Sequence, residues 1–157
     1  MRCQPLDRAS DDATAEREVV AVVRDFLANR CEREVVETTD TPAFAGNRVG
    51  FKVLNQVAQL AEEHGFAFMD QLVGPYTGRA LAPLATIDLV GWDVHAAIVD
   101  NLYANTHDIC HEHFALPAYM RTLIANGTLG RKSGGGFFRR EGKVSHVLDL
   151  ATGQYKP

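Results

Sequence analysis

Apolar residues recur every three or four positions along most of this chain, which is the period of an amphipathic α-helix. The first such run starts after Ser10 and Thr14, either of which could cap its N-terminus. Its apolar positions are Val19, Val22, Val23, Phe26 and Leu27. A longer run from Ala45 to about His64 repeats the pattern at Val49, Val53, Val57, Leu60 and Ala61. We predict a helix for each run, with one face turned toward a core.

Three shorter helices are predicted in the second half of the chain. Pro83 can open the first, because proline is well tolerated at the first helical position. Residues 92–108 form the second, with apolar positions that include Val94, Ile98 and Leu102. The third starts at Pro117 and ends at Asn126-Gly127. Its apolar stripe comprises Leu116, Tyr119, Met120, Leu123 and Ile124.

Two segments have the composition of β-strands. Residues 33–38 (REVVET) are rich in β-branched side chains and end at the Asp40-Thr41-Pro42 turn. A single strand has no partner for its backbone groups, so we interpret this piece as the end of an α/β unit whose remainder is absent. After residue 141, KVSHVLDL and the Thr152-Gly153 turn predict a small hairpin or an extended tail. The predicted fold is therefore mainly α.

Composition narrows the class of protein. The 157 residues are 46% hydrophobic and 23% charged, which suffices for a buried core. A net charge of -4 argues against sequence-independent nucleic-acid binding, which requires a clustered basic surface. No stretch has the apolar length of a membrane span. Three widely spaced cysteines suggest reduced thiols, so we expect a cytoplasmic protein.

One segment, HDICHEH, combines His and Cys residues and raises the question of a metal site. His107 and His111 would share a face if the preceding helix continued this far, and Cys110 and His113 lie nearby. The HExxH order of helical zinc sites is absent, and histidine clusters are common near surface turns. The sequence therefore predicts no metal site.

The glycine-rich loop RKSGGGFF is a second candidate for ligand binding. A phosphate cradle needs GxxxxGK[ST], or GxGxxG between a strand and a helix, and neither spacing is present in residues 127–136. We interpret the loop as a turn that lets Phe137 and Phe138 tuck under the helices. Trp92 and Met120 are likewise predicted to be core residues rather than parts of a cofactor site.

The pair Asn47-Arg48 is unusual because it interrupts an apolar run at the start of a predicted helix. The backbone N–H groups of a first helical turn are unpaired and the helix dipole is positive there, which favours an oxygen-bearing ligand. From this stretch alone, an asparagine that merely faces solvent is the simpler interpretation.

Three stretches taken together resemble the C-terminal half of the 3-hydroxyacyl-CoA dehydrogenase family. They are TPAFAGNRVG at 41–50, IDLVGWDVHAAIVDNLY at 87–103, and LIANGTLGRKSGGGFF at 123–138. Their order and spacing also match the family. The matching residues are Thr41, Pro42, Phe44, Asn47 and Arg48, then Val90, Gly91 and Asp93, then Gly130, Lys132, Ser133, Gly134, Gly136 and Phe137.

The resemblance implies a fold and a reaction. The fold is the helical C-terminal domain of this family, of the 6-phosphogluconate dehydrogenase C-terminal-like type. The reaction is NAD-dependent oxidation of 3-hydroxyacyl-CoA to 3-ketoacyl-CoA in fatty-acid β-oxidation. The family's Rossmann domain, with its glycine-rich turn and a His base oriented by a Glu, precedes the region that this chain matches. We therefore expect no NAD binding and no activity from this chain alone.

Asn47 is the one catalytic-site residue that the resemblance assigns, because the equivalent Asn in the family points at the reacting end of the substrate. None of the chain's histidines occupies the context of the family's base. They are His64, His95, His107, His111, His113 and His146.

The resemblance also predicts how the chain is organised. Residues 1–40 would be a helix-strand remnant of the nucleotide-binding domain with a linker, 41–140 the helical domain, and 141–157 a tail or spacer of the kind that leads to another domain in longer bacterial forms. We interpret the chain as a fragment. Its expected role is that of a substrate-side and dimerisation domain, pairing with an upstream Rossmann domain and with a second copy. We expect the second copy to pair through the apolar stripes around Val94 to Tyr103 and Leu116 to Ile124. The alternative is a stand-alone helical oligomerisation or interaction module that has lost the chemistry.

Overall fold

The computed structural model describes residues 17–157, and the chain divides after Val49 into two compact units. The predicted N-caps Ser10 and Thr14, and Cys3, lie outside the described residues. The described part is mainly helical, as the sequence predicts. None of its helices is long and apolar enough to cross a membrane.

The first unit contains the helix predicted around Val19 to Leu27. It consists of α1 (Arg17–Asp25) continued by a π-helical turn, η1 (Phe26–Arg30). The apolar face of α1 is exposed, with Val22 at 69% of its maximum accessible surface. The side chains of Arg24 and Glu37 form an ion pair that links α1 to the segment after it.

The prediction of a strand at residues 33–38 is wrong for the described structure. Residues 32–37 have no regular secondary structure, and only Thr38 takes part in a β-bridge. A strand requires a neighbour that satisfies its N–H and C=O groups, so β-branched composition by itself does not produce one. The helix of the predicted helix-strand remnant is therefore present, and the strand is not.

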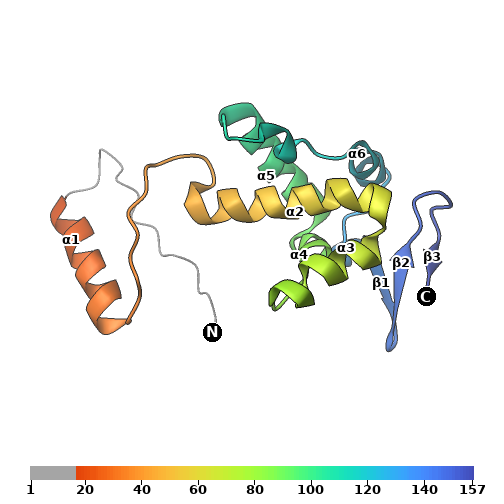
Figure 1. Ribbon diagram of the computed structural model, residues 1–157, viewed down its shortest axis with the longest axis horizontal. Helices are drawn as coiled ribbons and strands as arrows, with labels where there is room; N and C mark the ends of the chain where they lie inside the picture. Colours follow the sequence, from red (N-terminus) through yellow and green to blue (C-terminus); the bar gives the residue numbers. More distant parts are fainter. Residues whose placement is uncertain (1–16) are drawn as a thin grey trace. The chain divides into compact units, whose positions relative to one another are not determined.

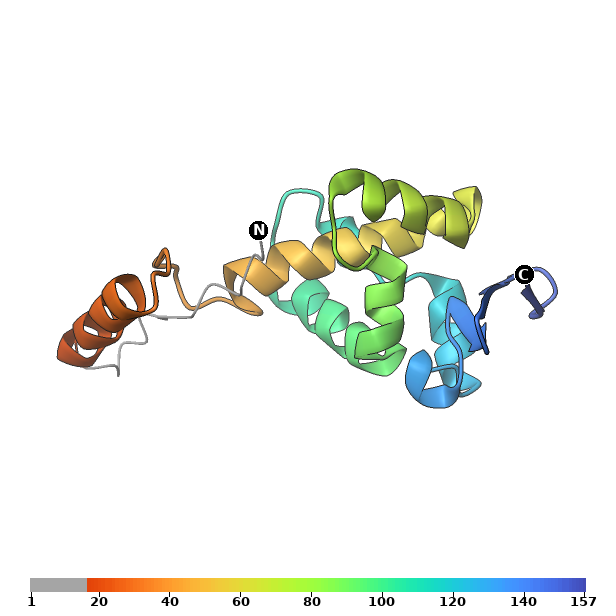
Figure 2. The same ribbon diagram turned by 90° about the horizontal axis from the view of Figure 1, so that it is seen from below.

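The second unit is a set of helices around α2 (Phe44–His64), which begins in the first unit (Figures 1 and 2). α2 ends where the apolar period predicts. The further helices are α3 (Phe66–Val73), η2 (Pro75–Thr77), α4 (Pro83–Val90), α5 (Trp92–Asn105), η3 (His111–Phe114), α6 (Ala118–Ala125) and η4 (Arg131–Ser133). Pro83 opens α4, and Pro117 precedes α6 as its N-cap residue. α5 stops three residues before its predicted end.

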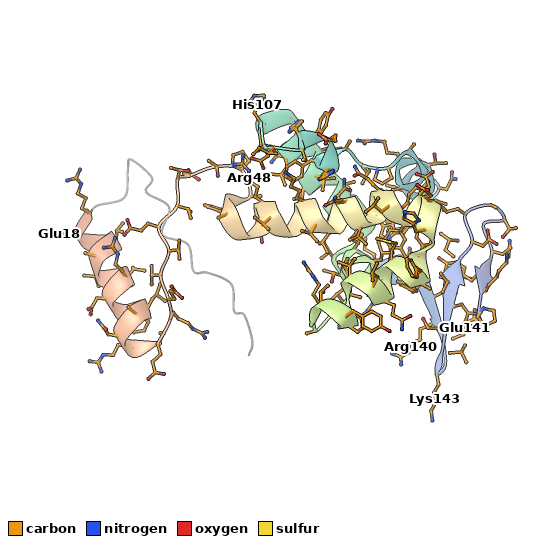
Figure 3. The ribbon with its side chains drawn as sticks, viewed as in Figure 1. Glu18, Arg48, His107, Arg140, Glu141 and Lys143 are labelled. Atoms are coloured by element: carbon orange, nitrogen blue, oxygen red, sulfur yellow. The ribbon has the colours of Figure 1, made fainter. Side chains whose placement is uncertain are left out.

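The predicted C-terminal hairpin is present and gains a third strand. β1 (Phe138–Glu141), β2 (Val144–Leu148) and β3 (Tyr155–Lys156) form an antiparallel sheet in the order β1-β2-β3. Arg140, Glu141 and Lys143 lie along the β1–β2 hairpin, with Lys143 near its tip (Figure 3). Leu148 at the end of β2 is buried against the helices.

Aromatic and aliphatic side chains from every major helix of the second unit form its core. Trp92, Met120 and Phe137 are fully buried, which confirms their prediction as core residues. The ring of Phe137 lies 4.4 Å from that of Trp92 and 4.9 Å from that of Phe66, measured between centroids. Contacts of this kind stabilise a core beyond simple area burial. The glycine-rich loop therefore delivers Phe137 into the core.

A buried polar pair joins α2 to α5. The ring Nε2 of His95 lies 3.1 Å from Oδ1 of Asn55, and both side chains are fully buried. An amide oxygen only accepts, so Nε2 of His95 carries a proton and donates it to this hydrogen bond. Its other nitrogen, Nδ1, has no hydrogen-bond partner among the described residues. Burial lowers the pKa of His95 from 6.5 to about 4.

We predict that His95 makes the fold less stable in acid. The unfolded chain binds a proton at His95 as the pH falls through 6.5, whereas the folded chain binds it only near its depressed pKa of about 4. Stability from this group is therefore complete above pH 6.5 and is lost as the pH falls from 6.5 toward 4. Between pH 7 and pH 5 the loss should be about 2 kcal/mol.

Urea unfolding of wild type and of His95→Gln at the two pH values measures this loss of unfolding free energy. Glutamine can still donate to Asn55 but does not titrate. The wild-type loss should exceed that of the variant by the stated amount, because all other titrating groups are shared. Equal losses in the two proteins would contradict the assignment.

Candidate functional site

Asn47 lies on the first turn of α2 with its side chain exposed. The helix starts from a tight turn in which the N–H of Phe44 donates to the carbonyl of Thr41 at 2.9 Å. Ala43 and Phe44 have φ angles of 60° and 51°, a left-handed conformation that is uncommon for residues other than glycine. Such conformations are retained where the surrounding structure requires them.

The helix position next to Asn47, Gly46, faces open space among the described residues. No neighbouring atom lies within 4 Å of the place where a Cβ on Gly46 would be. Arg48, the next residue, is half-buried (Figure 3). An exposed amide and the positive end of the helix dipole therefore lie together at this end of α2.

Sequence reasoning missed Asp88, which is the group that joins the second and third matched stretches. Asp88 is on the last turn of α4 and only 2% exposed. Its carboxylate accepts from the indole Nε1 of Trp92 at 2.6 Å and from the backbone N–H groups of Phe137 and Phe138 at 3.0 and 2.9 Å. Burial raises the pKa of Asp88, and the three donors oppose this shift.

The glycines of the loop allow its backbone to reach this carboxylate. A Cβ on Gly136 would lie 2.0 Å from Oδ1 of Asp88, and one on Gly130 would lie 2.6 Å from the Asp88 carbonyl oxygen. Gly130 also has a φ of 81°, which side chains disfavour. Beside this contact, the Lys132 ammonium pairs with the carboxylate of Asp93. The contacts of Asp88 with the loop residues 130 and 136–138 thus form one structural joint between the two stretches.

A pocket of about 590 Å³ lies next to the joint. Its walls carry the carboxylates of Asp70 and Asp88 and the cationic side chains of Arg131, Arg140 and Lys143. Asp70 caps α4 by accepting from the N–H of Leu84 at 2.6 Å, and burial raises its pKa. Both carboxylates are occupied by backbone donors, so neither is placed as a free acid or base.

The histidine pair expected from the HDICHEH spacing does not form a ligand pair. α5 ends at Asn105, so no single helix carries both His107 and His111. The ring centroids of these two residues are 6.2 Å apart. His111 instead stacks on Tyr103, at 4.5 Å between centroids. The structure brings together a different set, Cys110, Glu112 and His113.

Comparisons with known proteins match the same region. A family model described as "3-hydroxyacyl-CoA dehydrogenase, C-terminal domain" matches residues 44–140. A probable 3-hydroxyacyl-CoA dehydrogenase of Bacillus subtilis is 34% identical over 133 residues, which are 83% of this chain and 17% of that protein. One from Deinococcus radiodurans is 34% identical over 126 residues, 78% of this chain and 36% of that protein.

Solved structures show the same fold. The crystal structure of FadB2 from Mycobacterium tuberculosis aligns with a TM-score of 0.68 at 23% identity, covering 81% of this chain and 44% of that one. The chain therefore spans well under two thirds of the relatives that it matches.

We predict that Asp88→Asn destabilises the second unit by about 3 kcal/mol, because the new amide N–H₂ group would face backbone or indole N–H donors where a carboxylate now accepts. Asp93→Asn is the matched control. It removes one exposed ion pair, with Lys132, and should change stability little. Chemical denaturation measures the free energy of unfolding of both variants. Equal losses would show that the buried carboxylate of Asp88 does not hold the two stretches together.

Proposed function

The chain belongs to the 3-hydroxyacyl-CoA dehydrogenase family, and we propose that it is the substrate-side and dimerisation domain of an enzyme that oxidises 3-hydroxyacyl-CoA to 3-ketoacyl-CoA in fatty-acid β-oxidation. The observation that carries this proposal is the match of residues 44–140 to the family's C-terminal domain. The complete enzyme comprises this domain and a nucleotide-binding domain of the Rossmann type.

NAD is the cofactor that we assign to the complete enzyme. When bound, it would supply the acceptor for the hydride that leaves C3 of the substrate, and the His of the upstream domain would be the base for the hydroxyl proton. This chain has no GxGxxG sequence, the usual fingerprint for the pyrophosphate, so we assign NAD binding to the partner domain. The chain's own contribution is to hold the substrate.

The exposed face of α1 supports the existence of a partner domain. Val19, Val22 and Phe26 are 54%, 69% and 56% exposed, although their spacing is that of a buried helix face. Contiguous apolar surface of this kind usually marks an interaction site. We propose that the upstream domain covers it, with residues 1–40 forming part of that domain and its linker.

Asn47 is the residue of this chain that we place at the reacting end of the substrate. Its amide is exposed on the first turn of α2, where the helix dipole also favours an oxygen atom. A donated hydrogen bond would hold the substrate oxygen as its proton leaves. Because the side chain is exposed, this role does not compete with packing.

We propose that the domain also self-associates, through a surface formed by Phe68 and Leu72 of α3 and Tyr76 of η2, which we call the α3 surface. These side chains are 58%, 44% and 75% exposed. Of the two stripes that the sequence suggested for this purpose, the one from Leu116 to Ile124 packs on the chain's own core, with Leu116 and Met120 buried. The one from Val94 to Tyr103 leaves these two side chains 42% and 48% exposed, less than Phe68 and Tyr76. Association through α3 would remove the largest side chains of this surface from water.

The catalytic role predicts that Asn47→Ala lowers turnover of the complete enzyme by roughly a hundred- to a thousand-fold, the usual cost of losing one positioned donor. Asn47→Asp should be at least as harmful, because it places negative charge beside an oxygen that gains electron density. Exposed Asn105→Ala is the control and should have little effect. Thermal melts must remain near wild type, since helix starts also affect stability. Near-normal turnover of Asn47→Ala would remove Asn47 from the site.

The association is tested by sedimentation of this chain at tens of micromolar, a range suited to weak symmetric dimers. Wild type should form dimers, and Phe68→Glu should weaken them at least about tenfold because it places a charge in an apolar contact. Ile109→Glu changes an equally apolar and more exposed side chain outside the α3 surface, and should leave the dimer intact. A wild-type monomer would refute self-association and leave another domain of the enzyme as the cover of α3.

A further inference from the structure

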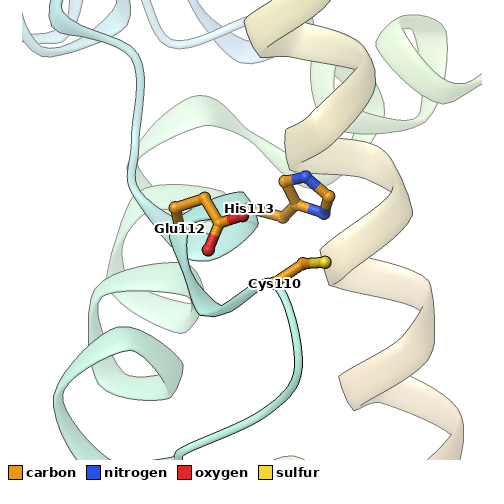
Figure 4. Close-up of side chains that lie close together, drawn as sticks. All are labelled: Cys110, Glu112 and His113. Carbon is orange, nitrogen blue, oxygen red and sulfur yellow. The ribbon is translucent and has the colours of Figure 1, made fainter.

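We propose that the segment after α5 binds a Zn²⁺ ion through the thiolate of Cys110, the carboxylate of Glu112 and the imidazole of His113. One ligand atom from each of these side chains lies within 4.8 Å of the other two. Figure 4 shows the three side chains gathered beside a helix, with the thiol and the imidazole ring close together. Nothing in the family reaction uses these residues.

The distances suit a tetrahedral ion with small side-chain adjustments. Zinc bonds of about 2.3 Å to sulfur and about 2.0 Å to nitrogen or oxygen place the ligand atoms of a tetrahedron about 3.5 Å apart. Rotations about the side-chain bonds can close the remaining gap, since Cys110 and Glu112 are exposed and His113 is half-buried. Three protein ligands leave the fourth position to water.

The donor set selects zinc over the hard cations. A thiolate and an imidazole are soft or borderline ligands, whereas Mg²⁺ and Ca²⁺ prefer oxygen throughout. On binding, the Cys110 thiol releases its proton to solvent, so that thiolate and carboxylate together balance the charge of the ion. The reaction requires no oxidant or other reactant.

Side chains of α2 hold the backbone of this segment in place. Asn55 Nδ2 donates to the carbonyl of His113 at 2.7 Å, and Gln59 Nε2 donates to that of Glu112 at 2.9 Å. The ammonium of Lys52 donates to the carbonyl of Ile109, one residue before Cys110. Asn55 is itself fixed by buried His95. The backbone that carries the ligand residues is thus positioned before any ion arrives, which lowers the free-energy cost of binding.

The backbone at Cys110 is consistent with this constraint. Its φ and ψ are 55° and 51°, a left-handed conformation that residues with a side chain seldom adopt. The anchored residues on both sides of Cys110 hold it there. Because these anchors are hydrogen bonds from α2, the fold does not depend on the metal, and removal of the metal should leave the domain folded.

The experiment uses the full chain, stripped of metal and kept reduced with a phosphine, and titrated with Zn²⁺ by calorimetry and with Co²⁺ by absorption. One ion should bind per chain, and Co²⁺ should give a thiolate-to-metal charge-transfer band. Cys110→Ser should abolish that band, and Glu112→Gln and His113→Ala should each weaken Zn²⁺ binding at least about tenfold, since even outer partners of a metal contribute this much.

The matched controls are a Cys3→Ser, Cys31→Ser double variant and His146→Ala, which remove the other thiols and a histidine outside the cluster. Both should bind as wild type does. The proposal fails if wild type takes up no more Zn²⁺ than a triple Cys110→Ser, Glu112→Gln, His113→Ala variant. It also fails if the charge-transfer band survives in Cys110→Ser. The readout is independent of the dehydrogenase proposal, so either can fail alone.

Discussion

The buried carboxylate of Asp88 is the constraint on which the architecture of the second unit depends. A charge removed from water must be surrounded by donors, and here they come from the start of α5 and from the loop that leads into β1. The loop can supply them only if its backbone approaches closely, which explains glycine at 130 and 136. The same approach delivers Phe137 into the core beside Trp92. The glycine-rich loop thus binds a buried carboxylate of the same chain through its backbone N–H groups, and it is not a phosphate-binding loop.

Local patterns predicted the elements that depend on local physics. The bounds of α2, the start of α4 at Pro83 and the C-terminal hairpin follow from apolar period, proline position and turn residues. The contact of Asp88 with residues 136–138 was not predictable in this way, because it joins positions about fifty residues apart. Asn55 was not predictable from the apolar period either, because it lies on the opposite side of α2 from the predicted stripe, of which Val49 and Leu60 are exposed in the structure. The strand at 33–38 failed for the opposite reason, because local propensity was present and a pairing partner among the described residues was not.

α2 connects the two chemical hypotheses. Its first turn carries Asn47, for which we propose a role in substrate binding, and its later turns hold the backbone of the segment that carries Cys110. The two regions use the helix differently. At its start, the exposed amide of Asn47 and the helix dipole are the useful features. Further along, side chains at Lys52, Asn55 and Gln59 satisfy the carbonyl groups of an irregular segment, which gives that segment fixed geometry without regular secondary structure.

The central claim is that this chain supplies the substrate side of a two-domain dehydrogenase. The most direct test fuses it to the nucleotide-binding domain of the Bacillus subtilis relative and follows NADH formation from a 3-hydroxyacyl-CoA, with each half measured separately. The account predicts NADH only from the fusion, because the hydride acceptor and the substrate must be held side by side. NADH formation by this chain alone, or none from a folded fusion that binds NAD, would contradict it.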